Sequence, residues 1–249
     1  MNRYGLLGHK LGHSQSKVIH EYLFEKSNID AEYDLIELEE FELETQINKI
    51  REGIYCGYNV TIPYKEKVIP FLDELTDSAK EINAVNTIYI SNGLLIGDNT
   101  DYLGFIDELN LYGIDVSGKD VYVLGSGGAS KAIIYALRKL SANPIVVSRD
   151  NSKGITYRQL NEIEHFDLIV NTTPVGMYPN VHGEVLSKEI VSKADYCIDL
   201  ICNPKVTKFL EYAKVGYNGI YMLIFQAIHA EHKWQKEISY DLEELYNKM

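Results

Sequence analysis

Short apolar runs alternate with amphipathic stretches along the first hundred residues of the chain. An apolar run bounded by turn residues predicts a strand, and apolar positions that recur with helical spacing predict a helix. The alternation of the two patterns indicates an α/β fold. The predicted strands cover residues 4–7, 33–38 and 57–61, and the predicted helices cover residues 17–26 and 41–50.

Two further apolar runs, 87–90 and 94–96, flank the dipeptide Asn92-Gly93. Asn and Gly readily adopt the positive φ angles that a tight two-residue turn requires. We therefore expect an antiparallel hairpin to close this half of the chain.

The second half of the chain begins with a helical stretch at 101–112. It is followed by the continuous apolar run 121–124, which is typical of a strand buried on both faces. Strands separated by helical segments predict a parallel, doubly wound sheet. We place the boundary between the halves near residue 101 and expect further helices from about residue 222 onward. The other predicted strands of this half are 145–147, 168–170, 197–200 and 219–221.

The composition limits the classes of partner. The 249 residues are 45% hydrophobic, which is enough for a large core, and the formal net charge is -12. Such a charge repels the phosphates of nucleic acids and anionic membrane surfaces, so we expect neither as a partner. A site for an anionic small molecule must therefore gather its own cations and hydrogen-bond donors.

The three cysteines are odd in number and lack the CxxC spacing of metal sites, which fits a reducing compartment. Neither a signal-peptide core nor a run of about 18 apolar residues is present. We expect a soluble cytoplasmic protein. The sequence leaves its oligomeric state open, a homodimer included.

Two histidine pairs have spacings at which metal ligands occur. His9 and His13 are four residues apart, and His229 and His232 are three apart on a predicted helix. A zinc site needs at least three protein ligands, and neither pair has an evident third. We expect no metal.

A glycine-rich turn directly follows the predicted strand 121–124. It reads Gly125-Ser126-Gly127-Gly128-Ala129-Ser130 and leads into a helix-favouring run. Gly125 permits a tight turn, and Gly127 lets the backbone approach a pyrophosphate at the helix N-terminus. The alternative is a tight connection without a ligand, but the strand–turn–helix order favours a dinucleotide site.

The end of the next predicted strand bears on the choice of cofactor. It reads Ser148-Arg149-Asp150, with Lys153 close behind. An acidic residue here favours NAD through the ribose hydroxyl, whereas an arginine favours the 2′-phosphate of NADP. Both signals are present, and the two cations favour NADP.

Polar side chains gather in short segments of the first half. Ser14 and Ser16 precede a predicted helix, where they could bind a carboxylate or simply cap the helix. Asn59 and Thr61 should point to the same side of a strand because side chains alternate, and such a pair can hold vicinal hydroxyls. The other members of this group are Lys65, Asn86 and Asp101.

Seven segments in this order resemble the shikimate dehydrogenase family, also described as shikimate/quinate dehydrogenases, across nearly the whole chain. They are His13-Ser14-Gln-Ser16, Gly57-Tyr-Asn59-Val-Thr61-Ile-Pro63-Tyr-Lys65, Ala84-Val-Asn86-Thr87, Asn99-Thr100-Asp101-Tyr-Leu-Gly104, Gly125-Ser126-Gly127-Gly128-Ala129, Asn171-Thr-Thr-Pro174-Val-Gly176-Met177 and Gly219-Ile-Tyr-Met222-Leu-Ile-Phe-Gln226.

The resemblance implies an NADPH-dependent, reversible reduction of 3-dehydroshikimate to shikimate, in the pathway to chorismate and the aromatic amino acids. It implies a substrate-binding domain of residues 1–100 and 220–249, to which the C-terminal helices return, and a Rossmann-like NADP-binding domain of residues 101–219.

The resemblance also implies roles for individual residues. Lys65 and Asp101 would form the catalytic pair within the substrate site, while Ser14 and Ser16 would bind the substrate carboxylate. The ring hydroxyls would be contacted by Asn59, Thr61, Asn86, Asp101 and Gln226. The cofactor would be contacted by Gly125, Ser126, Gly127, Gly128, Ala129, Ser148, Arg149, Lys153, Gly219 and Met222, the last two lying near the nicotinamide.

Three departures from the family pattern bear on this reading. Lys17 replaces a proline, Cys202 replaces a tyrosine that lines the substrate and nicotinamide, and Ser148-Arg149-Asp150 replaces Asn-Arg-Thr. Asp150 motivates the alternative of an NAD-dependent quinate/shikimate dehydrogenase. A second alternative, of another class, is a nucleotide-sensing module without catalysis, because a fold alone does not establish an activity.

Overall fold

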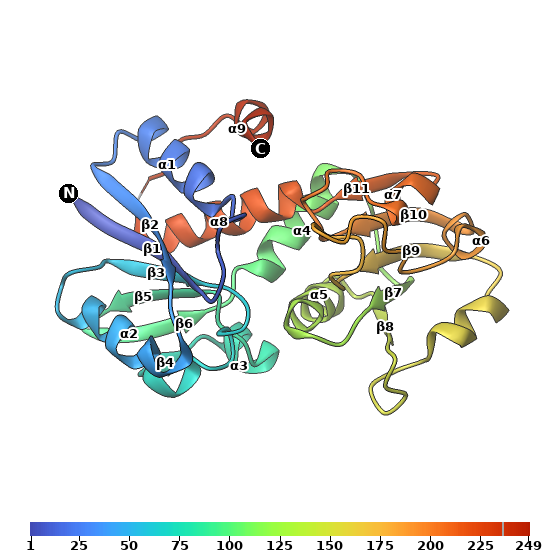
Figure 1. Cartoon of the computed structure of the whole chain (residues 1–249), viewed down its shortest axis with the longest axis horizontal. Helices are drawn as coiled ribbons and strands as arrows, with labels where there is room; N and C mark the ends of the chain where they lie inside the picture. Colours follow the sequence, from blue (N-terminus) through green and yellow to red (C-terminus); the bar gives the residue numbers. More distant parts are fainter. Residues whose placement is uncertain (236) are drawn as a thin grey trace. The chain divides into compact units, whose positions relative to one another are not determined.

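The computed structural model describes residues 1–235 and 237–249. The chain divides into two compact units (Figure 1). The first comprises Met1–Gly104 with Leu223–Met249, and the second comprises Phe105–Met222. Both contain a sheet and helices, so the expected α/β class is confirmed, as is the return of the C-terminal helices to the first unit.

The first unit is built on a six-stranded mixed sheet with the order β2-β1-β3-β5-β6-β4. β1, β2 and β3 run parallel, whereas β5 is antiparallel to β3 and to β6. Its strands are β1 Asn2–Gly8, β2 Ala31–Glu37, β3 Gly57–Val60, β4 Glu74–Leu75, β5 Thr87–Ser91 and β6 Leu94–Asp98.

Both faces of this sheet are covered, which explains why its strands read as apolar runs. On one face Leu7 packs in a core with Ile47 of α2, and on the other Leu6 packs in a core with Phe24 of α1. Figure 1 shows α1 and α8 on one side of the sheet and α2 on the other. The helices of this unit are α1 Ser16–Lys26, α2 Leu43–Arg51, α3 Asp77–Ile82 and α9 Leu242–Lys248, with 3₁₀ turns at Glu40–Glu42 and Ile69–Phe71.

The predicted hairpin is confirmed. β5 and β6 pair antiparallel around Asn92 and Gly93, whose φ angles are 50° and 81°. Positive φ at both central residues gives the turn the twist of the flanking strands. The two-residue strand β4 was not predicted, because so short a segment has no period to read.

The second unit contains a five-stranded parallel sheet with the order β11-β10-β9-β7-β8. The chain moves outward from β7 to β8 and then returns to the other side of β7 for β9. In open parallel sheets, ligands bind at the carboxyl ends of the strands where the order reverses. The strands are β7 Asp120–Leu124, β8 Asn143–Val147, β9 Phe166–Asn171, β10 Ala194–Asp199 and β11 Gly216–Asn218.

The helices that separate these strands are shorter than the alternation suggested, apart from α5. They are α5 Gly128–Lys139, α6 Lys188–Val191 and α7 Lys208–Tyr212, with a 3₁₀ turn at Tyr157–Glu162. Two longer helices, α4 Asp101–Leu111 and α8 Ile220–Trp234, contain the points at which the chain passes from one unit to the other. Within the described ranges, no helix is both long enough and apolar enough to span a membrane.

The predicted strand at 219–221 is wrong. β11 ends at Asn218, and α8 begins at Ile220. The side chain of Asn218 accepts a hydrogen bond from the backbone N–H of Ile220 at 3.2 Å, which satisfies a free donor at the helix start. A short apolar run cannot by itself distinguish a strand from a buried helix, and here tertiary packing decides.

The predicted helix at 41–50 also needs a correction at its start. Its first turn is a 3₁₀ turn, Glu40–Glu42, and α2 begins only at Leu43. Glu39 and Glu42 form a reciprocal capping box at this turn.

Candidate active site and dinucleotide turn

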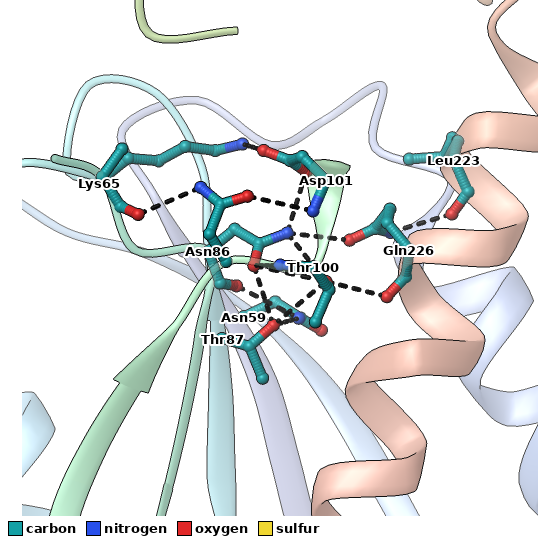
Figure 2. Close-up of polar contacts among 10 residues, drawn as sticks. Asn59, Lys65, Asn86, Thr87, Thr100, Asp101, Leu223 and Gln226 are labelled. Carbon is teal, nitrogen blue, oxygen red and sulfur yellow. Dashed lines mark hydrogen bonds and ion pairs between the residues drawn. The ribbon is translucent and has the colours of Figure 1, made fainter. Parts of the chain in front are cut away.

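Lys65 and Asp101 form a close ion pair in the first unit. Lys65 follows β3 in the chain, and Asp101 is the first residue of α4. The ammonium Nζ lies 2.6 Å from the Asp101 Oδ2, and the two side chains are 18% and 11% exposed (Figure 2). Partial burial strengthens such a pair relative to one in open water. The pair therefore has a fixed geometry and still reaches the surface.

Asn86 joins this pair to the rest of the site. Its Nδ2 donates to Asp101 Oδ1 at 2.8 Å, to Thr100 Oγ1 at 3.0 Å and to Gln226 Oε1 at 3.3 Å. Its Oδ1 accepts from the backbone N–H of Thr100 at 2.7 Å. Both Asp101 oxygens are thus engaged, one by Lys65 and one by Asn86. Such paired contacts hold the carboxylate in one orientation.

Gln226 reaches the same cluster from α8. Thr100 Oγ1 donates to its backbone carbonyl at 2.9 Å, and its own Nε2 donates to the Leu223 carbonyl at 2.8 Å. Gln226 and Asn86 are 140 residues apart in the chain. The first unit therefore assembles the cluster from the end of its first segment and the start of its second (Figure 2).

Asn59 is buried at the end of β3 and is more completely bonded than the sequence suggested. Its Nδ2 donates to the Asn86 carbonyl at 3.2 Å and to Thr87 Oγ1 at 3.3 Å. Its Oδ1 accepts from the hydroxyl of Tyr33 at 2.7 Å. The carboxamide is therefore tied to the scaffold beneath Lys65 and Asp101.

Thr61 comes just after the end of β3, which stops at Val60. It donates its backbone N–H to the Leu7 carbonyl, and its methyl group faces Gly8, where an added Cβ would lie 2.9 Å from it. Among the described hydrogen bonds none joins Thr61 to Asn59. The predicted pairing of the two side chains stays a prediction.

Ser14 and Ser16 lie at the start of α1. Ser16 is the first helical residue and is buried, while the hydroxyl of Ser14 accepts a hydrogen bond from the Ser16 N–H at 3.3 Å. This hydrogen bond lies at the first turn of α1, whose N-cap residue is Gln15, and the carboxylate-binding role of the two serines stays a prediction. Within the described residues, no hydrogen bond connects either serine to the cluster around Asn86.

Several members of the site were not assigned from the sequence. Thr87 and Thr100 adjoin Asn86 and Asp101 in the chain, and both are fully buried with their hydroxyls in the network. Their place next to Asn86 and Asp101 in the sequence is the feature that could have identified them. Asn99 caps α4 by accepting from the N–H of Asp101 at 3.1 Å. Nothing in the sequence pointed to Tyr33, because it contacts Asn59 only in the folded sheet.

The glycine turn of the second unit follows the carboxyl end of β7. Gly125 has φ of 105°, and an added Cβ would lie 2.9 Å from Thr172 Oγ1, so both its conformation and its packing favour glycine. Beside Gly127 and Gly128 there is open space, which a Cβ would fill. Ser130, which replaces the third glycine of the general motif, is buried and donates to the Gly127 carbonyl at 2.6 Å. The turn therefore leaves the backbone at the N-terminus of α5 uncovered by side chains at Gly127 and Gly128.

The turn after β8 contains local contacts of Asp150. The Asp150 carboxylate accepts from the N–H and the hydroxyl of Ser152 at 3.0 and 2.7 Å, and these hydrogen bonds lower its pKa. Lys153 lies 3.9 Å away, and Ser148 Oγ accepts from the Asp150 N–H at 3.1 Å. Asp150 thus forms hydrogen bonds within its own turn, and the side chains of Asp150 and Arg149 are both exposed.

The other predicted cofactor residues lie near the C-terminal end of the second unit. Gly219 is closely packed, since an added Cβ would lie 2.8 Å from the Leu200 carbonyl oxygen. Met222 donates its backbone N–H to Glu108 Oε1 at 3.4 Å. Burial raises the pKa of the Glu108 carboxyl to about 8 and that of the Cys202 thiol to about 12. Burial therefore disfavours the thiolate form of Cys202.

One group of metal-type side chains was not anticipated. His165, Asp167 and Asp195 place their ligand atoms within 4.8 Å of one another at the surface of the second unit. The Nζ of Lys119 already lies 3.9 Å from Asp167 Oδ1. Exposed acidic groups of this kind are common without an ion, and the cation nearby opposes one.

Comparisons with known proteins agree with this arrangement. Residues 6–88 match the family described as the shikimate dehydrogenase substrate binding domain. A shikimate dehydrogenase (NADP(+)) of Caldanaerobacter subterraneus is 38% identical over 99% of this chain and 95% of its own.

Solved structures give the same result. A chorismate mutase/shikimate 5-dehydrogenase fusion protein from Clostridium acetobutylicum superposes with a TM-score of 0.94 at 38% identity, covering 99% of this chain and 96% of that one. A shikimate 5-dehydrogenase from Thermus thermophilus, solved with NADP(H) and shikimate, has a TM-score of 0.90 at 28% identity over 100% and 98% of the two chains. Because the relatives match over nearly their whole length as well as that of this chain, the protein belongs to the shikimate dehydrogenase family.

Proposed function

We propose that this protein catalyses the reversible, NADPH-dependent reduction of 3-dehydroshikimate to shikimate, on the route to the aromatic amino acids. One observation supports the proposal above all others. Lys65 and Asp101 lie 2.6 Å apart in a partly buried cluster with Asn86 and Gln226. Such a cluster offers a cation, hydroxyl-binding amides and a fixed carboxylate to a small polyhydroxylated ring.

The first unit supplies the substrate site in this proposal, with residues 1–100 and 220–249 as the substrate-binding domain. Asp101, Asn86 and Gln226 bind the ring hydroxyls, and Asn59 and Thr61 complete this side of the site. Ser14 and Ser16 bind the carboxylate, because hydroxyls and free N–H groups at the start of α1 favour an anion. The net charge of -12 makes such local donors necessary.

Lys65 is the proposed proton donor. When bound, NADPH supplies a hydride to the carbonyl carbon of 3-dehydroshikimate, and the carbonyl oxygen gains negative charge. The Lys65 ammonium stabilises that charge and transfers a proton to the oxygen, which gives the hydroxyl of shikimate. Asp101, held by Asn86, keeps the ammonium in place and orients it. In the reverse direction Lys65, as the neutral amine, accepts the hydroxyl proton.

The second unit supplies the cofactor site, with residues 101–219 as the NADP-binding domain. The open backbone at the start of α5 suits a pyrophosphate, and the residues proposed to line it are Gly125, Ser126, Gly127, Gly128 and Ala129. Ser148, Arg149 and Lys153 hold the 2′-phosphate, and Gly219 and Met222 adjoin the nicotinamide. Because Asp150 is engaged by Ser152, the exposed Arg149 favours NADP over NAD.

A turnover assay with two acids and two cofactors tests the proposal. Purified protein is mixed with shikimate or quinate and with NADP⁺ or NAD⁺, and formation of reduced nicotinamide is followed by absorbance. We expect the highest kcat/KM with shikimate and NADP⁺. A preference for quinate with NAD⁺ would support the alternative dehydrogenase. If no pair of substrates is turned over although NADP⁺ binds, the protein is a nucleotide-sensing module.

A further inference from the structure

A buried pair of titratable side chains lies in the first unit, outside the cluster around Asn86. His20 is on α1, Glu231 is on α8, and both are fully buried. The His20 Nδ1 lies 2.5 Å from the Glu231 Oε1, although the two residues are 211 positions apart in the chain. The proposed reaction assigns no chemical step to either residue.

An aromatic contact connects the pair to the site. The ring of His20 stacks on that of Tyr33 with centroids 4.2 Å apart and planes inclined by 5°. The hydroxyl of Tyr33 then donates to Asn59 Oδ1 at 2.7 Å. Glu231, His20 and Tyr33 thus form a buried column that ends on the carboxamide of Asn59.

The Asn86 carbonyl and Tyr33 together fix how that carboxamide lies. The Nδ2 of Asn59 faces the backbone carbonyl of Asn86, which can only accept, so Oδ1 must point toward Tyr33. Burial raises the pKa of the Tyr33 hydroxyl well above its ordinary value, and it therefore remains a donor at every physiological pH. The scaffold fixes Asn59 from both ends of its amide.

The column also joins the helices that bear two other proposed substrate residues. His20 lies about one helical turn after Ser16 on α1, and Glu231 lies about one and a half turns after Gln226 on α8. A contact between His20 and Glu231 therefore sets the distance and the rotation between these two helices at the level of the site. In the proposed function, residues of α1, β3 and α8 bind the substrate, and the column contacts each of these three elements.

Stability alone does not account for the pair. In the described structure, the His20 Nε2 and the Glu231 Oε2 are buried without a hydrogen-bond partner. Burying two such groups is costly, and apolar residues of similar volume in place of a buried pair are often neutral or stabilising. Retaining polar groups here is reasonable if they specify one arrangement of the elements, which is the best-attested use of buried polar contacts.

We propose that Glu231, His20 and Tyr33 are positioning residues that shape the proposed substrate site by aligning α1 with α8 and by orienting Asn59. The proposed function assigns none of the three a contact with the substrate. The inference rests on the proposed function, since it concerns the affinity of the first unit for a shikimate-like acid. It assigns specificity to residues outside the cluster around Asn86.

The first test removes one hydroxyl. In Tyr33→Phe the ring and its stacking on His20 remain, while the hydrogen bond to Asn59 is lost. We expect kcat/KM for shikimate to fall about three- to tenfold, as the loss of one hydrogen bond implies, with KM for NADP⁺ unchanged. Tyr4→Phe is the matched control, because Tyr4 is buried in the same cluster but its hydroxyl accepts from Gln235. That variant should keep the wild-type kcat/KM.

The second test replaces the pair by apolar residues in the double variant His20→Leu/Glu231→Met. We expect a melting temperature equal to or above that of the wild type, a several-fold higher KM for shikimate and an unchanged KM for NADP⁺. A stable double variant with the wild-type kcat/KM for shikimate would overturn the positioning role of the pair. A double variant that fails to fold would also overturn it, since the pair would then serve stability.

A readout without turnover separates this inference from the proposed function. If the wild-type protein neither binds nor turns over shikimate, the proposed function fails. The column is then judged from the side-chain amide signals of Asn59 in a nitrogen–proton NMR spectrum. These signals should move in Tyr33→Phe and in the double variant but stay in place in Tyr4→Phe. Unmoved signals in Tyr33→Phe contradict the orienting role of Tyr33 whatever the substrate.

Discussion

Lys65 and Asp101 hold each other in a geometry that a free lysine would rarely keep. A long ammonium side chain at the surface samples many rotamers, and fixing it costs conformational entropy. Here Asp101 takes the Nζ at 2.6 Å and is itself fixed by Asn86 at 2.8 Å. The cost of ordering Lys65 is thus met in the folded protein before any substrate binds, which favours a role in catalysis.

Lys65→Met separates charge from shape, because it keeps much of the length and apolar stem while deleting the ammonium. We expect kcat to fall by roughly 10² to 10⁴, since the proton donor and the charge near the oxygen are both lost, with shikimate binding retained. Steady-state turnover and calorimetric binding measure the two effects. Lys67→Met is the control, because Lys67 is an exposed neighbour paired with Glu40. Turnover of Lys65→Met within about threefold of the wild type would refute the role.

Arg149 is the residue on which cofactor preference should depend. Its exposed guanidinium stands beside Asp150, whose carboxylate is already engaged by Ser152. Arg149→Ala should weaken NADP⁺ binding by about 1.5 to 3 kcal/mol through loss of a charge-assisted phosphate contact, with little effect on NAD⁺. Dissociation constants for both nucleotides test this, with Arg138→Ala at the far end of α5 as control. An unchanged ratio of the two constants would show that another residue reads the phosphate.

At the scale of single elements, two acidic residues of α4, Asp101 and Glu108, differ in how their carboxyl groups are hydrogen-bonded. Asp101 begins the helix with both carboxylate oxygens bonded, whereas Glu108, two turns later, is fully buried. Glu108 accepts one long hydrogen bond from Met222, and its second oxygen lacks a partner within the described residues. Burial raises its pKa from 4.5 to about 8, so the folded protein holds this carboxyl protonated at neutral pH.

The raised pKa of Glu108 predicts a pH-dependent stability. Below about pH 4.5 this residue is protonated in both the folded and the unfolded chain, and its protonation does not lower the unfolding free energy. As pH rises toward the folded pKa of about 8, only the unfolded chain loses the proton, and the unfolding free energy falls by up to about 1.4 kcal/mol per pH unit.

Glu108→Gln should remove this dependence, because glutamine resembles the protonated acid in shape and charge. Urea unfolding between about pH 5 and pH 8 should show a flatter profile and a higher stability at pH 8. The exposed Glu162→Gln should keep the wild-type slope. Asp199, whose pKa burial raises to about 6, leaves a residual slope at the acidic end. Identical slopes for wild type and Glu108→Gln would mean that the buried acid is not protonated.

At the scale of the whole molecule, the proposed function assigns the substrate and the cofactor to different compact units. A ligand that binds only the folded protein raises the unfolding free energy by about 2.7 kcal/mol at one hundred times its dissociation constant. Shikimate and NADP⁺ should each raise the melting temperature. Each increase should depend on residues of one unit alone.

Ser14→Ala and Arg149→Ala therefore form a reciprocal pair of variants. The first should reduce the stabilisation by shikimate and leave that by NADP⁺, and the second should do the reverse. Thermal unfolding with each ligand at a fixed concentration measures both. Parallel loss of both effects in either variant would contradict the assignment of one ligand to each unit.

The linear sequence determined the features that depend on neighbours in the chain. Alternating apolar runs predicted most strands and helices, because burial on both sheet faces leaves a local apolar pattern in the sequence. Asn92-Gly93 predicted its hairpin through φ preferences that belong to those two residues. The turn that begins at Gly125 and the segments around Lys65 and Asp101 were recognisable because their chemistry is contained in short motifs.

Tertiary structure alone decided what joins distant segments. Residues 219–221 read as a strand, but packing makes Ile220 the start of α8. Asn86 meets Gln226 across 140 residues, and His20 meets Glu231 across 211, contacts to which no periodic pattern points. The Asn59 Oδ1 accepts a hydrogen bond from Tyr33, which lies in another strand. Hydrogen bonds are directional and act over about 3 Å, so their partners are settled only when the folded backbone brings them together.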